Sequence, residues 1–294
     1  MNDTIFVTGA SGHLGRLVIQ HLLARGVTPA RIIAGSRNPG KLADLAASGI
    51  EVRKADFEDH QGLIEAFKGV STAFIISTDA LEEAGARLKQ HRNAVSAAAA
   101  AGVQRLAYTS QFNPDSSLLS FAHDHLETER AIKATGLSYL IFRNGWYHQN
   151  LLMSLPAALK SGHWHSAAEG GRTSYAAREE IAEAIAVALA GPSIDSRVYT
   201  LTGSEALTRE EIAELARRTT GKPLDVVKVN DEQFTAGLNA AGVPAVFVAV
   251  LASIEAEIRA GNLSIVTDHL ESLIGRPAKR LGDYLQEDKA SYLG

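Results

Sequence analysis

Short apolar runs alternate with amphipathic segments along the first half of this sequence. Runs rich in β-branched and apolar residues predict strands, and apolar positions spaced three or four residues apart predict helices. We expect strands at 5–8, 31–36, 51–54, 72–77, 105–110 and 139–142. We expect helices at 14–25, 38–48, 60–67, 82–101 and 122–135. This alternation is typical of an α/β fold of the Rossmann type, a doubly wound parallel sheet with helices on both faces.

The regular alternation ends after residue 143. Residues 144–175 contain aromatics, glycines and polar turns, with one helical piece near 151–160. Beyond them we expect helices at 179–190 and 208–219 and a strand at 197–202, and a smaller unit built from the segments 224–229, 231–241, 246–260 and 269–274. Thr208 has the residue type of an N-cap, followed by acids in the first helical turn. We therefore predict a Rossmann domain over 1–150 and 174–202, interleaved with a smaller α/β substrate domain over 151–173 and 203–294.

A glycine-rich turn joins the first strand to the first helix. Its glycines are spaced G-x-x-G-x-x-G, one residue off the fingerprint of dinucleotide-binding proteins. Glycine lets the backbone approach a pyrophosphate, and the N–H groups of a helix N-terminus attract its charge. An ordinary glycine turn is the alternative, which the position directly after the first strand disfavours. We predict that a dinucleotide binds at Gly9, Ser11, Gly12, His13, Leu14 and Gly15.

The end of the second strand indicates which dinucleotide binds. An acid about 20 residues beyond the glycine motif would bind the ribose of NAD, but this strand ends in Ser36-Arg37-Asn38. The guanidinium of Arg37 suits a 2′-phosphate, and Lys41 adds a second cation one helical turn on. A solvated helix start is the alternative for both residues. We predict NADP(H) as the cofactor.

Polar residues also follow the third, fourth and fifth strands, where ligands of such sheets bind. Asp56, followed by Phe57, stands where a carboxylate would accept from the adenine amino group. The alternative for Asp56 is the N-cap of the next helix, a role for which Asp59 competes. Ser77, Thr78 and Ser110 complete the groove that we expect to bind the cofactor.

Composition excludes several classes of protein. The net charge of −4 and the absence of any Lys/Arg-rich run give no basis for binding nucleic acid. The chain has no cysteine, which excludes disulfides and thiolate chemistry and suits a reducing compartment. We see no basic-then-apolar leader and no apolar run long enough to span a bilayer, so we expect a cytoplasmic protein without membrane contact.

These motifs resemble the short-chain dehydrogenase/reductase superfamily, and more closely its atypical NmrA-like branch. Within that branch the chain is similar to the group of type 2 NAD(P)H:quinone oxidoreductases and triphenylmethane reductases. Besides the Thr-Gly-x-x-Gly-x-x-Gly turn, Arg37 and Asp56, the resemblance rests on four segments. They are Tyr108-Thr-Ser110, His125-Leu-Glu-Thr-Glu129, Leu140-Ile-Phe-Arg-Asn-Gly-Trp-Tyr147 and Arg172-Thr-Ser-Tyr, continuing into Ala-Ala-Arg-Glu-Glu-Ile-Ala182. The glycine motif identifies only the superfamily, and the Arg-Asn-Gly-Trp-Tyr segment is the specific part.

One departure from the superfamily changes the expected chemistry. Ordinary members carry a Y-x-x-x-K pair on the helix after the fifth strand, and here its positions align with Phe121 and His125. Phenylalanine has no proton to donate. The resemblance implies direct hydride transfer to an electron-poor acceptor, such as a quinone or a similar small aromatic compound. We predict that Asn144, Tyr147 and His125 stabilise the developing oxyanion.

Several alternatives remain at this point. His125 has the alternative of a capping or core histidine, and Trp146 and Tyr147 that of core aromatics rather than a sandwich around a flat ring. The pairs His123/His125 and His163/His165 suggest a metal, but helical residues two apart face different ways, and we predict none. The alanine-rich helix is expected to pack closely on the sheet, with a homodimer surface as the alternative.

Two other functions also remain. A non-catalytic NADP(H)-binding redox sensor, a kind of protein found in the NmrA-like branch, would tolerate the loss of the catalytic pair. An isomerase or epimerase is disfavoured, because the relatives with that activity generally retain the tyrosine.

Overall fold

The computed structural model describes residues 3–81, 83, 85–192 and 195–293, and its largest sheet has seven strands, six from residues 5–144 and one from residues 197–201. The strand order is β10-β6-β5-β4-β1-β2-β3, so the chain reverses its direction of winding next to β1. Parallel pairings join β3, β2, β1, β4 and β5. The strands are β1 (Ile5–Val7), β2 (Ile32–Ser36), β3 (Glu51–Lys54), β4 (Thr72–Ile75), β5 (Arg105–Gln111), β6 (Ser138–Asn144) and β10 (Arg197–Leu201). The doubly wound α/β fold is thereby confirmed.

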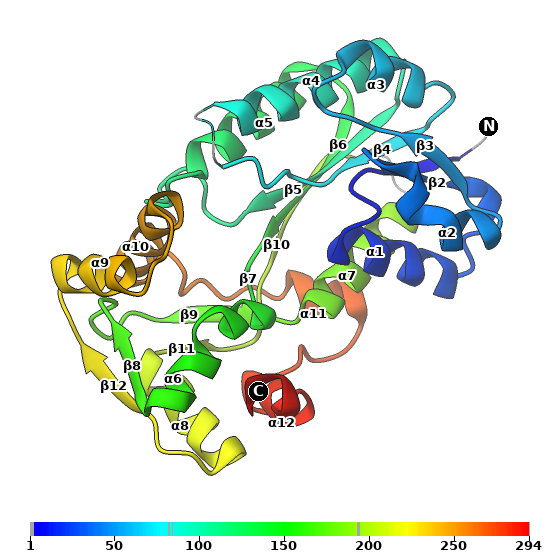
Figure 1. Cartoon of the computed structure of the whole chain (residues 1–294). Coiled ribbons are helices and arrows are strands. Elements are labelled where there is room, and N and C mark those ends of the chain that lie inside the picture. Colours follow the sequence, from blue (N-terminus) through cyan, green and yellow to red (C-terminus); the bar gives the residue numbers. More distant parts are fainter. Residues whose placement is uncertain (1–2, 82, 84, 193–194, 294) are drawn as a thin grey trace. The chain divides into compact units, whose positions relative to one another are not determined.

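Helices line both faces of this sheet (Figure 1). One face carries α3 (His60–Ala66), α4 (Ala86–Ala100) and α5 (Ala122–Ala134), and the other carries α1 (His13–Ala24) and α7 (Arg178–Ala190). Two 3-10 turns and a short helix flank β2, namely η1 (Pro29–Arg31), η2 (Pro39–Leu42) and α2 (Ala43–Ala47).

The alanine-rich helix α4 is part of the core. Ala94, Ala97 and Ala98 are fully buried, together with Phe6 and Phe67, whose rings meet edge to face at 5.0 Å. Small side chains let the helix backbone approach its neighbours closely, which agrees with the predicted packing on the sheet. The expected start of this helix, at residue 82, lies outside the described residues, and the described helix begins at Ala86.

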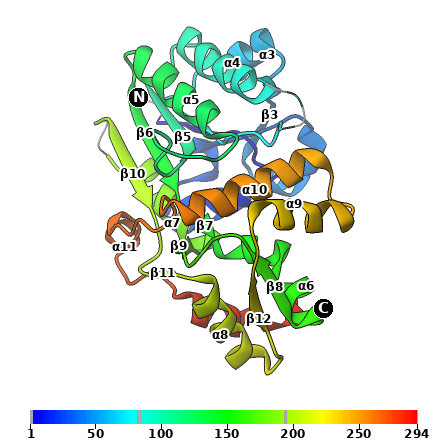
Figure 2. The same cartoon turned by 90° about the vertical axis from the view of Figure 1, so that its left-hand side faces the viewer.

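The later part of the chain forms short strands and helices of its own. Its strands are β7 (Trp146–Tyr147), β8 (His163–Ser166), β9 (Thr173–Ala176), β11 (Ala206–Leu207) and β12 (Asp225–Lys228). Its helices are η3 (His148–Met153), α6 (Leu155–Ser161), α8 (Arg209–Thr220), α9 (Asp231–Ala240), α10 (Ala245–Arg259), α11 (His269–Ile274), α12 (Leu281–Glu287) and α13 (Lys289–Leu293). Strand β12 pairs in parallel with β8, and α9 lies beside α10 (Figure 2).

Most predicted elements exist within a few residues of their expected bounds, and the exceptions have local causes. The predicted helix over 38–48 is divided into η2 and α2. The predicted helix near 151–160 is likewise divided, because Ser154 and Pro156 separate η3 from α6. Strands β7, β8, β9 and β11 and helices α12 and α13 were not predicted. The predicted N-cap Thr208 is confirmed, since it forms a capping box with Glu211 at the start of α8.

By its internal contacts the chain divides into two compact units, each made of separated segments. The first unit comprises residues 1–111, 123–143 and 181–199. The second comprises residues 112–122, 144–180 and 200–294. Among the described residues, no helix is both long and apolar enough to cross a membrane.

Candidate functional site

The glycine turn between β1 and α1 has positions that only glycine fits. Gly9 has a φ of +58°, in the left-handed region. A Cβ atom on Gly15 would lie 2.5 Å from the Gly9 carbonyl oxygen and 2.9 Å from the Cα atom of Ala10. A Cβ atom on Gly12 would lie 3.3 Å from the same oxygen. The glycines therefore let the turn fold tightly against the start of α1.

The N-terminus of α1 receives no side-chain cap from the described residues. Its N-cap is Gly12, and its first turn contains no acidic residue. The first N–H groups of a helix have no intrahelical acceptor and carry the positive end of the helix dipole. A pyrophosphate would satisfy both, so the turn and helix fit a dinucleotide.

The end of β2 lies against this turn. The Ala10 N–H donates to the Gly35 carbonyl at 3.0 Å, and the hydroxyls of Ser11 and Ser36 are 3.2 Å apart. A Cβ atom on Gly35 would lie 2.3 Å from the Phe6 ring, so Gly35 keeps the strand close. The next residue after Ser36, Arg37, is consequently held beside the turn.

Arg37 and Lys41 are both exposed next to the glycine turn. Arg16, in the first turn of α1, pairs with Asp44 at 2.6 Å and donates to the Lys41 carbonyl at 2.8 Å. These contacts fasten the segment that carries both cations to the helix N-terminus. The arrangement suits a phosphate on the adenosine ribose.

Past β3, the structure separates the roles of two aspartates. Asp59 is the N-cap of α3 and accepts from the Gly62 N–H at 2.9 Å, which leaves Asp56 outside the cap. Asp56 is half-buried and accepts from the Glu58 N–H at 3.2 Å. Phe57 is buried in the core, so its side chain serves packing, and its carbonyl accepts from Asn93 Nδ2 at 2.9 Å.

Buried polar atoms gather where β4 and β5 end. Among the described residues, Thr78 Oγ1 and Ser110 Oγ are buried without a hydrogen-bond partner. Ser77 differs, because its hydroxyl accepts from Thr109 Oγ1 at 3.2 Å. Gln111, the last residue of β5, has both side-chain amide atoms buried and without a partner in the described part of the chain, and it is a candidate site residue that the sequence analysis missed. The feature of the sequence that could have identified Gln111 is its position directly after Ser110. Unmet polar groups at strand ends favour a ligand there.

His125 lies inside the first unit, with 4% of its surface exposed. Its Nδ1 is 2.8 Å from the Tyr108 hydroxyl, and its Nε2 is 2.9 Å from Arg87 Nη2. Burial first, and the charge of Arg87 second, hold the pKa of His125 well below its usual value, so the ring is neutral. This geometry favours the core-histidine alternative over direct donation to a substrate.

Asn144 and Tyr147 form a pair in the second unit. Asn144 Nδ2 donates to the Tyr147 hydroxyl at 3.2 Å, and Asn144 Oδ1 is buried without a partner among the described residues. Burial raises the pKa of Tyr147, so its hydroxyl keeps its proton at neutral pH. The Arg178 guanidinium lies over the Tyr147 ring, 4.9 Å from its centre. The pair thus offers polar groups for a ligand oxygen.

The aromatic residues beside these candidates serve packing. Phe121 directly precedes α5 and is half-buried against an apolar cluster that includes Phe112 and Leu119. Trp146, in β7, packs against two apolar clusters of the second unit. These contacts favour the core alternative for Trp146.

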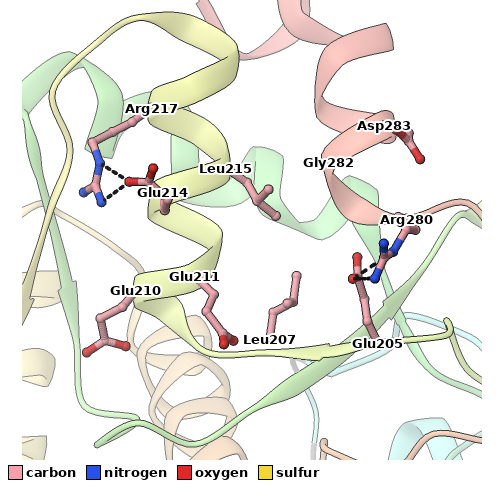
Figure 3. A pocket seen from close by; sticks show the side chains of 10 residues that line it. All are labelled: Glu205, Leu207, Glu210, Glu211, Glu214, Leu215, Arg217, Arg280, Gly282 and Asp283. Carbon is pink, nitrogen blue, oxygen red and sulfur yellow. Dashed lines mark hydrogen bonds and ion pairs between the residues drawn. The ribbon is translucent and has the colours of Figure 1, made fainter.

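A pocket in the second unit lies between α8 and α12 (Figure 3). Four of its carboxylates are ion-paired: Glu205 with Arg280 at 3.1 Å, Glu210 with Lys228 at 3.2 Å, Glu211 with Arg172 at 3.0 Å and Glu214 with Arg217 at 2.6 Å. Because these four carboxylates are already paired, this pocket is not our candidate for a cofactor site. Within the described residues, no group of three His, Cys, Asp or Glu side chains is arranged to hold a metal ion.

Comparison with known proteins agrees with this arrangement. The model of the NmrA-like family matches residues 1–281. Quinone oxidoreductase 2 of Escherichia coli strain K12 is 38% identical over 279 residues, which are 95% of this chain and 96% of the relative.

Solved structures extend the comparison. The NADPH-dependent quinone oxidoreductase of E. coli in complex with NADPH superposes with a TM-score of 0.91 at 37% identity, covering 97% of this chain and 99% of that one. Triphenylmethane reductase of Citrobacter sp., complexed with NADP(H), has a TM-score of 0.90 at 35% identity, with the same coverage. Because the family model matches residues 1–281 of the 294 residues, this chain belongs to the NmrA-like family.

Proposed function

We propose that this chain is an NADPH-dependent reductase that passes hydride to a quinone or a similar electron-poor conjugated acceptor. The broader activity, that of an NAD(P)H-dependent oxidoreductase, is the one that its similar relatives share by name. The finer choice of a quinone rests on the E. coli relatives and on the donors at Asn144 and Tyr147.

The observation that carries the cofactor is the uncapped N-terminus of α1 behind a turn so close that Gly15 has no space for a Cβ atom. The residues that would hold the pyrophosphate are Gly9, Ser11, Gly12, His13, Leu14 and Gly15. Arg37 and Lys41 would bind the 2′-phosphate, and Asp56 would accept from the adenine amino group. Ser77, Thr78, Ser110 and Gln111 would meet the remaining polar groups from the ends of β4 and β5. NADPH, when bound, supplies the hydride.

Asn144 and Tyr147 would stabilise the acceptor. Since Asn144 Nδ2 donates to the Tyr147 oxygen, the phenol proton is left to hydrogen-bond another oxygen. Tyr147 would donate that proton to the acceptor oxygen on which negative charge develops. With Phe121 at the position of the superfamily tyrosine, we assign no proton donor to that position. His125 would act only indirectly, through Arg87.

Steady-state assays with NADPH and a panel of benzoquinones and triphenylmethane dyes test the proposal. We expect NADPH oxidation with several of them and much weaker activity with NADH. An absence of turnover across the panel would contradict a reductase. Equal affinity for NADP⁺ and NADPH in that case would favour the redox-sensor alternative.

A further inference from the structure

Two buried side chains of α4 hold the main chain of Thr78 from both sides. The Thr78 N–H donates to His91 Nε2 at 3.0 Å, and Arg87 Nε donates to the Thr78 carbonyl at 2.7 Å. His91 is fully buried and Arg87 is 6% exposed. Both peptide groups of a residue that follows β4 are thus fixed by side chains rather than by a regular element.

These two side chains are themselves held by a buried polar network. His91 Nδ1 is 3.0 Å from Thr128 Oγ1, whose own hydroxyl donates to the Asp124 carbonyl at 2.6 Å. Arg87 Nη2 is 2.9 Å from His125 Nε2. Helix α5 therefore fixes the two α4 side chains that fix Thr78.

The hydrogen-bond partners determine which ring nitrogen of each histidine carries the proton. His91 Nε2 accepts from Thr78, and His125 Nε2 accepts from Arg87, so each neutral ring carries its proton on Nδ1. His125 Nδ1 then donates to the Tyr108 oxygen. Burial, with a smaller effect of Arg87, lowers the pKa of His91 to about 3. His91 Nε2 therefore stays unprotonated at neutral pH and can accept from the Thr78 N–H.

The segment held in this way adjoins the glycine turn. The Ile76 N–H donates to Thr8 Oγ1 at 2.8 Å. The Ile76 side chain lies beside Gly9, since a Cβ atom built on Gly9 would be 3.5 Å from it. Thr78, two residues further, has a buried hydroxyl without a partner among the described residues. A hydroxyl kept unpaired by a rigid main chain is prepared to bind a ligand.

We propose that Arg87 and His91 are positioning residues for the cofactor: they clamp the two peptide groups of Thr78 and so aim its hydroxyl at an oxygen of NADPH. The inference rests on the proposed function and assigns roles to two residues outside the binding groove. It also gives His125 a role, as the acceptor that orients the Arg87 guanidinium.

The test is a double-mutant cycle on the full chain, with NADPH affinity measured by titration without any acceptor. Thr78→Val removes the hydroxyl and keeps the side-chain shape, and we expect the Kd for NADPH to rise about fivefold, as for the loss of one hydrogen bond. His91→Leu removes the acceptor for the Thr78 N–H, and we expect a rise of similar size. In the Thr78→Val background, His91→Leu should add less than about twofold, because both changes remove one contact.

Two controls separate positioning from general loss of stability. His91→Gln places an amide oxygen near the former Nε2 and should restore most of the NADPH affinity. Val95→Ala, one turn further along α4 and 2% exposed, should lower the melting temperature while leaving the Kd within about twofold. If His91→Leu does not fold, Arg87→Lys replaces it, since lysine keeps the charge and loses the Nε–H donor.

Each outcome decides the inference. Coupled effects of Thr78→Val and His91→Leu, with rescue by His91→Gln, support it. Fully additive effects, an unchanged Kd in His91→Leu, or an equal loss in Val95→Ala overturn it while the proposed function stands. A wild-type chain that binds no NADPH overturns the proposed function and this inference together.

Discussion

Gly15 illustrates how single residues define the cofactor site. The position is buried in the first turn of α1, and glycine within a helix lowers its stability relative to alanine by about 1 kcal/mol. A Cβ there would overlap the Gly9 carbonyl, so the cost is offset by the close turn that glycine permits. Arg37 is the opposite case, an exposed side chain whose chemistry rather than its packing determines its role.

Arg37→Glu should weaken NADPH binding more than about tenfold and spare NADH, because the change replaces a cation beside the 2′-phosphate by an anion. The Kd values of both cofactors, from titration, check this. Arg25→Glu is the matched control: it makes the same charge change at the exposed C-cap of α1 and should leave both affinities unchanged. Equal binding of the two cofactors before and after Arg37→Glu would contradict the assignment.

Tyr147→Phe should lower kcat with benzoquinone about tenfold and leave the KM for NADPH unchanged, because it removes only the proton donor to the acceptor. Steady-state kinetics measure both. Tyr139→Phe, in β6 and packed against the core of the first unit, is the control that should change neither constant. A large rise in the KM for NADPH with unchanged kcat would show that Tyr147 serves the cofactor instead.

At the scale of elements, ion pairs of very different exposure fasten α5. Glu129 is 1% exposed and accepts from Arg143, in β6, through two hydrogen bonds of 2.9 and 2.7 Å. Glu127, on the same helix, pairs with Arg92 and Arg130 at the surface. Removal of one partner from a buried pair leaves a charge without compensation, whereas surface pairs contribute little.

Glu129→Ala should therefore lower the free energy of unfolding by about 3 kcal/mol, and Glu127→Ala should lower it much less. Urea denaturation of both variants at one pH measures the difference. Equal losses in the two variants would mean that the Glu129–Arg143 pair stabilises the protein no more than a surface pair does.

At the scale of the whole molecule, buried neutral histidines make stability depend on pH. Burial lowers the pKa of His91, in the first unit, to about 3, and the charge of Arg87 contributes less. Burial likewise lowers the pKa of His148, in the second unit, to about 3, with a smaller effect of Lys279. In the unfolded chain a histidine has a pKa of about 6.5. Between these values the unfolded state binds more protons, so stability is complete above about pH 6.5 and falls as the pH decreases towards 3.

Each of these histidines should lower the free energy of unfolding by about 2 kcal/mol at pH 5 relative to pH 7. The value follows because pH 5 is about 1.5 units below the pKa of the unfolded histidine, and each unit corresponds to about 1.4 kcal/mol. Denaturant midpoints at the two pH values check this. The His148→Gln variant, less stable at neutral pH, should show a shallower decrease than the wild type. A wild-type midpoint that is the same at both pH values would contradict the prediction.

The sequence could predict those features that depend on neighbours along the chain. The apolar runs predicted the central strands β1, β2 and β4, because a parallel strand buried on both faces is continuously apolar. The Thr208 cap and the glycine turn were also local. Strand β8 was not predictable in this way, because its parallel partner β12 is some sixty residues further along the chain and its His163–Ser166 pattern is half polar.

By itself, then, the sequence determined the fold class, the family resemblance and the residue types available for a 2′-phosphate, since these depend on periodicity, spacing and chemical type. Only the tertiary structure decided which polar groups are already satisfied. It placed His125 between Arg87 and Tyr108, and it left Thr78, Ser110 and Gln111 with buried atoms in need of partners. The physical reason is that hydrogen bonding and burial depend on residues brought together across the fold, and no local pattern records them.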